Sequence, residues 1–423
     1  MNVLVLNVGS SSVKFQLIET DSQRITTHTD VVHLQGSIEK IGTAEAILSY
    51  AFQDRPLQHT TEELLTHHAA ISRVVSLLER HPESASGALA AAPPEGERRK
   101  SALAIEAIGH RVVHGGEHFT HSHLVDESVV HGIERAIPLA PLHNPHNLKG
   151  YVVCRDLFPK LPQVAVFDTA FHHTLPPRAF LYGLPYDYYR RRRIRRYGFH
   201  GTSVRYVFFR YRELTGAART VSNLIVCHLG NGCSITAIEN GQSVDTSMGF
   251  TPLEGVMMGT RCGDIDPSVP LHLMTTEELA PHEVATLLNR WSGLYGLSGE
   301  SNDMRTLLNS MTAGDERSRL AVEVFCYRVR KYIGAYWAIL GRLDALVFTG
   351  GIGQNAAVVR QMICDRLDAL GCEIDETANL TLGGREGRIS TPASRVVVWV
   401  IPTNEELLIA RDTYRVVHGL PLP

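Results

Sequence analysis

The chain has 423 residues, 44% of them hydrophobic and 20% charged, and this length is enough for two domains that each bury a core of their own. A formal net charge of −3 gives no overall attraction to nucleic acid or to an anionic membrane, so we expect neither as a partner. No run of eighteen apolar residues occurs, and a membrane-spanning helix is therefore not expected.

Cysteine usage and the N-terminus both favour a cytoplasmic protein. The seven cysteines are odd in number, form no CxxC pair and mostly lie in apolar surroundings, as reduced core residues do. The first apolar run has no basic region before it, and Gly-Ser-Ser-Ser interrupts it after Val8. We interpret this run as a first strand and not as a signal peptide.

The first strand, in residues 3–17, continues through a small polar turn into a second strand, and the same pattern recurs in residues 224–239. Superposing the two segments aligns three pairs of residues: Asn7 with His228, Gly9 with Gly230, and Ser10 with Asn231. Turns of this kind can expose backbone N–H groups to an anion. The repeat predicts two similar lobes that each contribute a hairpin to a bound polyphosphate, although two short hairpins can also match by chance.

Three segments follow the first hairpin. Apolar residues recur at helical spacing in residues 62–81, which predicts a helix there. Residues 84–100 are rich in small residues and Pro and are expected to form a surface connector. Residues 107–119 read as a strand that leads into a Gly-Gly turn. Arg111 lies inside this apolar strand, and because a buried charge is costly without a partner, we expect it to meet an anion.

The middle of the chain carries further polar residues at the ends of predicted elements. His143 and His146 have HxxH spacing but no acidic or Cys partner nearby, so ordered-loop histidines are favoured over a metal site. Residues 164–169 form a short apolar strand with Asp168 at its end, and ligands bind at this edge in open α/β sheets. Within the basic run at residues 186–203, we interpret Arg190 to Arg193 as a solvated face, because nucleic-acid binding needs a wider basic surface.

In the second half, residues 248–268 are a Gly-rich loop with Arg261 among acidic neighbours, and such loops gather binding residues. Helices are expected at residues 271–293 and 317–339. Residues 346–355 predict a buried strand followed by a glycine turn. The turn fits the dinucleotide fingerprint loosely, and a dinucleotide site is disfavoured because no series of βαβ units surrounds it.

The C-terminal part predicts a last strand at residues 396–401 and then a helix that Asn404 can cap. No Walker A pattern occurs in the sequence, so any use of ATP would not involve a P-loop lysine.

Nine blocks spread over nearly the whole chain resemble the acetate kinase family, within the actin, Hsp70 and sugar kinase superfamily. In chain order they are NVGSSSVKF, GHRVVHGG, APLHNP, AVFDTAFH, RRYGFHGTS, HLGNGCS, MGFTPLEGVMMGTRCGDIDP, FTGGIGQN and PTNEEL. Several of these blocks are not shared with actin-like ATPases or sugar kinases. The resemblance implies an α/β fold of two actin-like, ribonuclease H-like lobes of duplicated topology with a cleft between them, usually in a homodimer. The lobes are expected at residues 1–168 plus 406–423 and at residues 169–405.

The resemblance also implies a reaction, the reversible transfer of the γ-phosphoryl group of ATP to acetate with Mg²⁺, or Mn²⁺ in its place, which gives acetyl phosphate and ADP. Asn7 and Glu405 match the metal-associated residues, Arg111 matches the arginine for the substrate carboxylate, and Asp168 matches the acid described as catalytic. His200 and Arg261 match the pair that stabilises the moving phosphoryl group. The ATP-contacting segments match Ser10, Ser12, Lys14, His228, Leu229, Gly230, Asn231, Gly232, Asp303, Met304, Arg305, Gly351, Ile352, Gly353, Gln354 and Asn355. The pocket for the acetate methyl group matches Val113, Leu142, Phe199 and Pro252.

Two positions depart from the family pattern, which commonly has Glu at Gln354 and His at Val204. Acetate has a pKa of about 4 to 5 and is already ionised at neutral pH, so we expect Asp168 to orient an arginine or a metal-bound water and not to remove a proton. A kinase for propionate or butyrate is the main alternative. An actin- or Hsp70-like ATPase is disfavoured, because a chaperone needs a peptide-binding domain after the ATPase and this sequence ends soon after its last predicted helix.

Overall fold

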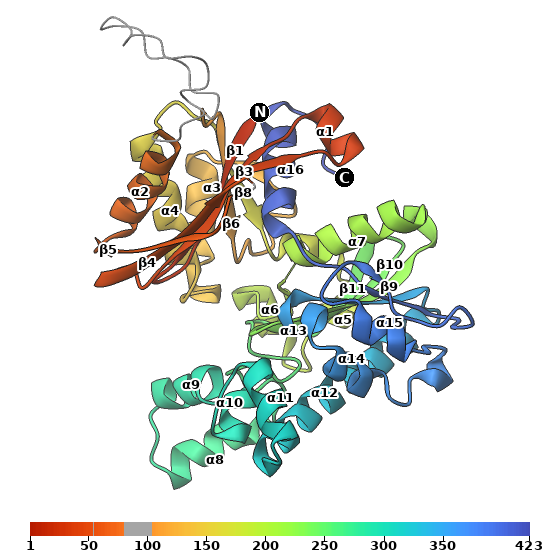
Figure 1. The fold of residues 1–423 in the computed structure, drawn as a ribbon. Coiled ribbons are helices and arrows are strands. Elements are labelled where there is room, and N and C mark those ends of the chain that lie inside the picture. Colours follow the sequence, from red (N-terminus) through yellow and green to blue (C-terminus); the bar gives the residue numbers. More distant parts are fainter. Residues whose placement is uncertain (54, 80–103) are drawn as a thin grey trace, which may run out of the picture. The chain divides into compact units, whose positions relative to one another are not determined.

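The structure, a computed structural model, describes residues 1–53, 55–79 and 104–423. The chain forms two compact units (Figure 1): unit 1 is Met1–Ala170 with Asn404–Pro423, and unit 2 is Phe171–Thr403. Each boundary lies two residues from the limit expected from the sequence. The connector predicted at residues 84–100 falls outside the described residues. In the described part of the chain, no helix is both long and apolar enough to cross a membrane.

Unit 1 is built on an eight-stranded sheet with the order β5-β4-β3-β2-β1-β6-β8-β7. Its strands are β1 (Asn2–Val8), β2 (Val13–Glu19), β3 (Val31–Glu39), β4 (Thr43–Phe52), β5 (Gln58–Leu64), β6 (Ala107–Val112), β7 (His123–Leu124) and β8 (Gln163–Phe167). Its helices are α1 (Ser22–Thr27), α2 (His67–Glu79), α3 (Glu127–Arg135), α4 (Asn144–Leu157) and α16 (Glu405–Val417).

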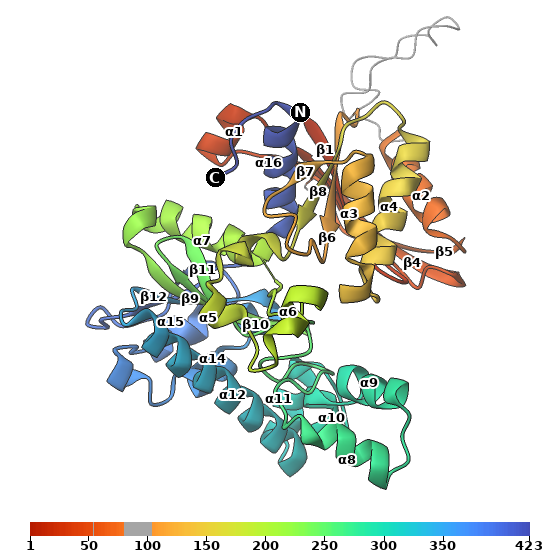
Figure 2. The ribbon, with the colours of Figure 1, turned by 180° about the vertical axis from the view of Figure 1, so that it is seen from behind.

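The apolar residues of β1 serve both faces of this sheet, because successive side chains of a strand point to opposite sides. Leu4 and Leu6 pack in one core with residues of α2 and α4, whereas Val3 and Val5 pack in another with residues of α16. Figures 1 and 2 show α2, α3 and α4 on one side of the sheet and α16 on the other.

Unit 2 has a six-stranded sheet with the order β11-β10-β9-β12-β14-β13. Its strands are β9 (Asn223–Leu229), β10 (Cys233–Glu239), β11 (Gln242–Thr246), β12 (Ala345–Thr349), β13 (Gly387–Arg388) and β14 (Val397–Val400). Its helices are α5 (Pro177–Phe180), α6 (Tyr186–Arg192), α7 (Gly201–Thr215), α8 (Ser268–Thr276), α9 (Pro281–Arg290), α10 (Gly293–Ser298), α11 (Met304–Thr312), α12 (Glu316–Leu340), α13 (Gly350–Asn355), α14 (Ala357–Cys364) and α15 (Glu376–Thr381).

The two sheets share one topology. The order β11-β10-β9-β12-β14 repeats the order β3-β2-β1-β6-β8, with two antiparallel pairs followed by two parallel pairs in both units. The hairpins β1–β2 and β9–β10 occupy the same place in each sheet, and Asn7 lies opposite Lys14 as His228 lies opposite Ser234. The duplicated topology predicted from the sequence is confirmed.

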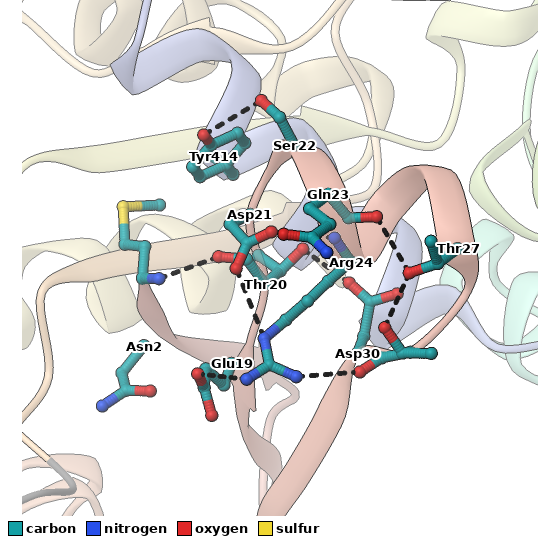
Figure 3. Close-up of polar contacts among 12 residues, drawn as sticks. Asn2, Glu19, Thr20, Asp21, Ser22, Gln23, Arg24, Thr27, Asp30 and Tyr414 are labelled. Carbon is teal, nitrogen blue, oxygen red and sulfur yellow. Dashed lines mark hydrogen bonds and ion pairs between the residues drawn. The ribbon is translucent and has the colours of Figure 1, made fainter.

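Helix α16 joins unit 1 although the chain reaches it only after unit 2. Its N-cap Asn404 accepts a hydrogen bond from the Leu407 N–H at 3.0 Å, as predicted. Near its other end, Tyr414 faces Ser22 at the start of α1 (Figure 3), with 3.1 Å between the two hydroxyl oxygens. Arg411 forms an ion pair of 2.7 Å with the buried Asp30. These contacts place Glu405, the first residue of α16, in unit 1, whereas the expected limits assign it to the second lobe.

Two predicted helices differ from the structure. Residues 58–64 pair with β4 as the strand β5, so the helix expected at residues 62–81 begins only at His67. The helix expected at residues 271–293 is divided into α8 and α9, because Pro281 lacks the N–H that would continue a helix and instead stands at the start of α9. The helix predicted at residues 317–339 is confirmed as α12.

Two predictions about local context are also wrong. The glycine turn expected after β12 is the short helix α13, and β12 runs parallel to both β9 and β14, so a parallel series does surround it. His146 lies in the first turn of α4 and His143 at its N-cap, not in a loop. By contrast, Arg190 to Arg193 are exposed as predicted, whereas Arg195 of the same basic run is buried.

Candidate active site

Arg111, Asp168 and Glu405 form a cluster of charges in unit 1. Strands β6 and β8 are parallel neighbours, which brings Arg111 of β6 beside Asp168, the residue after β8. The Arg111 guanidinium donates from Nη2 to Asp168 Oδ2 at 2.6 Å and from Nε to both carboxylate oxygens at 3.1 Å. Its Nε also lies 3.4 Å from Glu405 Oε2. Arg111 was expected to contact an anion, and in the structure it contacts the protein's own carboxylates, Asp168 and Glu405.

The electrostatics of this cluster favour additional positive charge. Burial raises the pKa of Glu405 to about 7, and the nearby Asp168 adds to this effect while Arg111 and Lys14 only partly oppose it. Burial alone would lower the pKa of Arg111, but the neighbouring carboxylates Asp168 and Glu405 outweigh burial and raise it. Together with Glu406, three carboxylates thus act against one guanidinium and one ammonium group.

The first hairpin lies close to this cluster. Its turn is closed by a hydrogen bond from the Gly9 N–H to the Ser12 carbonyl at 2.8 Å, and the side chains of Ser10 and Lys14 are exposed. Asn7 and Lys14 are directly opposite on an antiparallel pair, so their side chains share a face of the sheet. The positive charge of Lys14 acts to lower the pKa of Glu405.

Asn7 and Glu405 fit a magnesium ion by the chemistry of their donors. An amide oxygen and a carboxylate are hard ligands, and Mg²⁺ typically uses one or two protein ligands and keeps several waters. The described residues contain no group of three His, Cys, Asp or Glu side chains placed to hold a metal. Any metal at this position would therefore be held largely by water and by the phosphates of a substrate.

Two asparagines that the sequence reading missed hold this side of the site together. Asn147 of α4 donates to the Val8 carbonyl at 2.9 Å and accepts from the Val113 N–H at 3.0 Å, so one amide joins the ends of β1 and β6. Asn144, one turn earlier, bonds both the N–H and the carbonyl of His114. The signal in the sequence is a pair of amides one helical turn apart, Asn144 in the block APLHNP and Asn147 just after it.

Unit 2 brings His200 and Arg261 together at the second hairpin. His200 Nδ1 lies 3.0 Å from Ser234 Oγ, and its ring stacks on His228 with centroids 4.4 Å apart. A Cβ atom on Gly232 would lie 3.2 Å from His200 Nε2 and 3.5 Å from Arg261 Nη1. The two side chains therefore converge on the glycine turn.

Arg261 has only neutral neighbours in the described residues. Its Nη1 donates to the Pro252 carbonyl at 3.1 Å, no carboxylate of the described chain lies within ion-pair distance of it, and burial lowers its pKa. A guanidinium in these surroundings lacks a counter-ion, which is the condition for binding an anionic ligand.

In unit 2, two of the segments expected to contact ATP, those of Asp303 and Gly351, lie beside the third, the second hairpin. Asn302, next to Asp303, donates to Asn231 Oδ1 of the hairpin at 2.9 Å. Asp303 is the N-cap of α11 and pairs with the exposed Arg305 at 2.7 Å. Gly350, which opens α13, has a φ of +74° and approaches β9 so closely that a Cβ would lie 2.6 Å from the Leu229 carbonyl oxygen. The segment Gly351 to Asn355 thus starts beside the second hairpin.

The residues expected to line the methyl pocket belong to both units. Val113 is 9% exposed and Leu142 is 56% exposed, and both lie in unit 1. Phe199 and Pro252 lie in unit 2, where Phe199 is buried and the Pro252 carbonyl holds Arg261.

Comparison with known proteins identifies the family. The sequence model of the acetokinase family matches residues 2–411. The chain belongs to the acetokinase family. It is 51% identical to the acetate kinase of Solibacter usitatus over the full length of both chains, and 52% identical to that of Chloroherpeton thalassium over 99% of each. The acetokinase identity and fold predicted from the nine sequence blocks are confirmed.

Solved structures agree with this acetokinase assignment. The acetate kinase of Porphyromonas gingivalis matches with a TM-score of 0.88 and 42% identity, covering 98% of this chain and 99% of that chain. A propionate kinase from Francisella tularensis matches with a TM-score of 0.86 and 40% identity, covering 99% of this chain and 100% of that chain.

The two departures from the usual acetokinase pattern have local explanations. Val204 is fully buried in the apolar core beneath α7, while His200 is held by Ser234 and His228. Gln354 donates from its side-chain amide to the Gly384 carbonyl at 2.6 Å, a hydrogen bond that a carboxylate could not make.

Proposed function

We propose that this acetokinase transfers the γ-phosphoryl group of ATP directly and reversibly to acetate, giving acetyl phosphate and ADP. The observation that carries the proposal is the pair His200 and Arg261, which converges on the Gly232 turn and includes a guanidinium with no carboxylate partner among the described residues. Phosphoryl transfer proceeds through a loose transition state with charge on the peripheral oxygens, and catalysis consists mainly of positioning and charge neutralisation. Arg261 supplies that charge, and His200 supplies a hydrogen-bond donor beside it.

Arg111 binds the carboxylate of acetate in this proposal, and Asp168 holds Arg111 in place. The two-point contact between Asp168 and Arg111 supports an orienting role for the acid. Acetate is already ionised at neutral pH, so no general base is needed. Glu405 and Asn7 would hold Mg²⁺, which when bound supplies positive charge to the phosphate oxygens.

We also propose a cytoplasmic homodimer. All seven cysteines are free thiols, which suits a reducing compartment. Several large apolar side chains of unit 2 are exposed, among them Leu271 at 65% and Trp291 at 64%, and a second copy would cover such a surface. Sedimentation velocity at micromolar concentration tests the dimer, and a purely monomeric boundary would refute it.

A kinase acting chiefly on propionate is the second candidate, because one of the similar structures is a propionate kinase. ATP-dependent acyl-hydroxamate formation from formate, acetate, propionate and butyrate separates the two. We expect the highest kcat/KM with acetate, because one methylene in an apolar pocket is worth about 1 to 3 kcal/mol, which is about tenfold or more. Propionate or butyrate outperforming acetate would overturn the proposal.

A further inference from the structure

The segment that carries His200 and the loop that carries Arg261 are joined by polar contacts away from both side chains. Residues 247–267 contain no helix or strand, and within them Arg261 is held by one main-chain hydrogen bond, from the Met258 N–H to the Arg261 carbonyl at 3.1 Å. The segment before His200 meets this loop where the Tyr197 N–H donates to the Gly249 carbonyl at 3.0 Å. The relative position of His200 and Arg261 therefore depends on what else holds the two segments.

Arg196 is the main bridge between them. It lies four residues before His200, and its Nη1 donates to the carbonyls of Thr246 and Ser247, at 2.9 Å each, and of Met248 at 3.3 Å. Its Nη2 donates to Glu254 Oε1 at 2.5 Å. One guanidinium thus binds both the start of the loop and the carboxylate of Glu254, seven residues before Arg261.

Glu254 is also connected, through Tyr182, to Phe250 near the start of the loop. Its second carboxylate oxygen accepts from the Tyr182 hydroxyl, which in turn accepts from the Phe250 N–H at 2.7 Å. The carboxylate lies directly over Gly249, where a Cβ would come within 1.6 Å of Glu254 Oε2. Only glycine leaves room for this arrangement, so the loop conformation and the position of the carboxylate depend on each other.

A second contact closes the far end of the loop. Gly255 and Asp264 exchange two hydrogen bonds of 2.8 Å, one between their main chains and one from the Gly255 N–H to Asp264 Oδ1. Tyr332 of α12 donates to Asp264 Oδ2 at 2.5 Å. Main-chain hydrogen bonds also hold the residues between Gly255 and Asp264, which include Arg261, for example from the Gly259 N–H to the Asn231 carbonyl at 3.0 Å. Glu254 and its partners join the start of this stretch to the segment before His200.

We infer that Glu254, held by Arg196 and Tyr182, is a positioning residue that sets Arg261 against His200 for phosphoryl transfer. This inference rests on the proposed function. Glu254 itself touches no reacting atom, and its contribution is the geometry of two groups that must act on the same phosphoryl oxygens. Misplacing such groups by an ångström can cost about 100-fold in rate without loss of substrate binding.

The test compares Glu254→Gln with a matched control, Glu386→Gln. Glu386 also accepts two hydrogen bonds from an arginine of unit 2, Arg210, at 2.8 and 2.9 Å. Its side chain is 28% exposed against 30% for Glu254, and its ion pair is with Arg210 of α7 and not with Arg196. The two substitutions remove the same charge from the same kind of ion pair.

We expect Glu254→Gln to lower kcat about 10- to 100-fold and to leave KM for ATP and for acetate within about twofold of the wild-type values. The control Glu386→Gln should keep wild-type kcat, and the two variants should have similar Tm. Tyr182→Phe should show the same kcat-selective defect, and the double variant should be no worse than the poorer single variant, because both act through one contact. Wild-type kcat in either Glu254→Gln or Tyr182→Phe, or equal losses in Glu254→Gln and Glu386→Gln, would overturn the inference. An inactive wild-type protein in the same assay would instead refute the proposed function.

Discussion

Arg111 of unit 1 and Arg261 of unit 2 differ in what they contribute to stability. Arg111 neutralises the buried Asp168, whereas Arg261 has only neutral contacts in the described chain. Removing one partner of a buried ion pair costs about 3 to 5 kcal/mol, because it leaves the other charge uncompensated. Removing a guanidinium that has no counter-ion carries no such cost.

We therefore predict that Arg261→Ala keeps or slightly raises Tm while kcat falls on the order of 10² to 10³. Arg111→Ala should lose activity to a similar degree and lose stability as well. Thermal unfolding and steady-state kinetics on both variants check this. Wild-type kcat in well-folded Arg261→Ala protein would remove its assigned role.

Glu405 and Glu406 are adjacent carboxylates with different surroundings, since only Glu405 contacts Arg111. We predict that Glu405→Ala raises the Mg²⁺ concentration needed for half-maximal rate, or lowers kcat where metal cannot compensate, and that Glu406→Ala does much less. If Glu405 only favoured a helix N-terminus, its loss would cost about 0.3 to 1 kcal/mol of stability and leave metal dependence unchanged. Rate measured against Mg²⁺ for both variants distinguishes these roles.

His110 is a buried histidine of β6 that should make unit 1 sensitive to acid. It contacts Gln163 at 2.7 Å, and burial lowers its pKa from 6.5 to about 4. The unfolded chain therefore binds a proton that the folded chain excludes, so this contribution to stability is fully present above pH 6.5 and is lost as the pH falls towards 4. The loss is on the order of 3 kcal/mol.

Urea unfolding of the wild-type protein and His110→Gln at pH 7.5 and pH 5 measures this effect. The wild-type protein should lose more stability between the two pH values than the variant does. His114, whose pKa burial also lowers, is present in both proteins and cancels from the comparison. Equal pH dependence in the two proteins would show that His110 titrates normally.

At the scale of elements, the two hairpins show what local sequence can and cannot specify. Glycine and small polar residues between apolar runs specify β1–β2 and β9–β10, and both were predicted correctly. The helix expected at residues 62–81 failed at its start because an edge strand was available: residues 58–64 pair with β4, and such pairing overrides the helical spacing of a few apolar residues. Pro281 is the residue in the sequence that indicates a break between α8 and α9.

For the whole molecule, the decisive feature is that unit 1 is discontinuous in sequence. Ile409 and Ala410 of α16 pack with Val3 and Val5, and a Cβ on Gly109 would lie 2.6 Å from the Ile409 side chain. Helix α16 therefore contributes buried side chains to the core of unit 1.

We predict that deletion of residues 404–423 unfolds unit 1 but spares unit 2, because no residue of the apolar core that packs α7 on the second sheet lies beyond Thr403. Limited proteolysis should then leave a resistant fragment close to residues 171–403, and binding of a hydrophobic dye should rise. A truncated protein with wild-type resistance throughout would contradict this role of α16.

The sequence by itself determined the repeated hairpins, the strands that lead to Arg111 and Asp168, the Asn404 cap and the family, because each depends on residues that are neighbours in the chain. Tertiary structure alone decided that Asn147 joins β1 to β6, that Arg111 is already paired with Asp168 and Glu405, and that Arg196 and Glu254 join the segments of His200 and Arg261. Those contacts connect residues tens to hundreds of positions apart. No periodicity or spacing encodes such contacts, since they exist only once the sheets have formed and brought strand ends together.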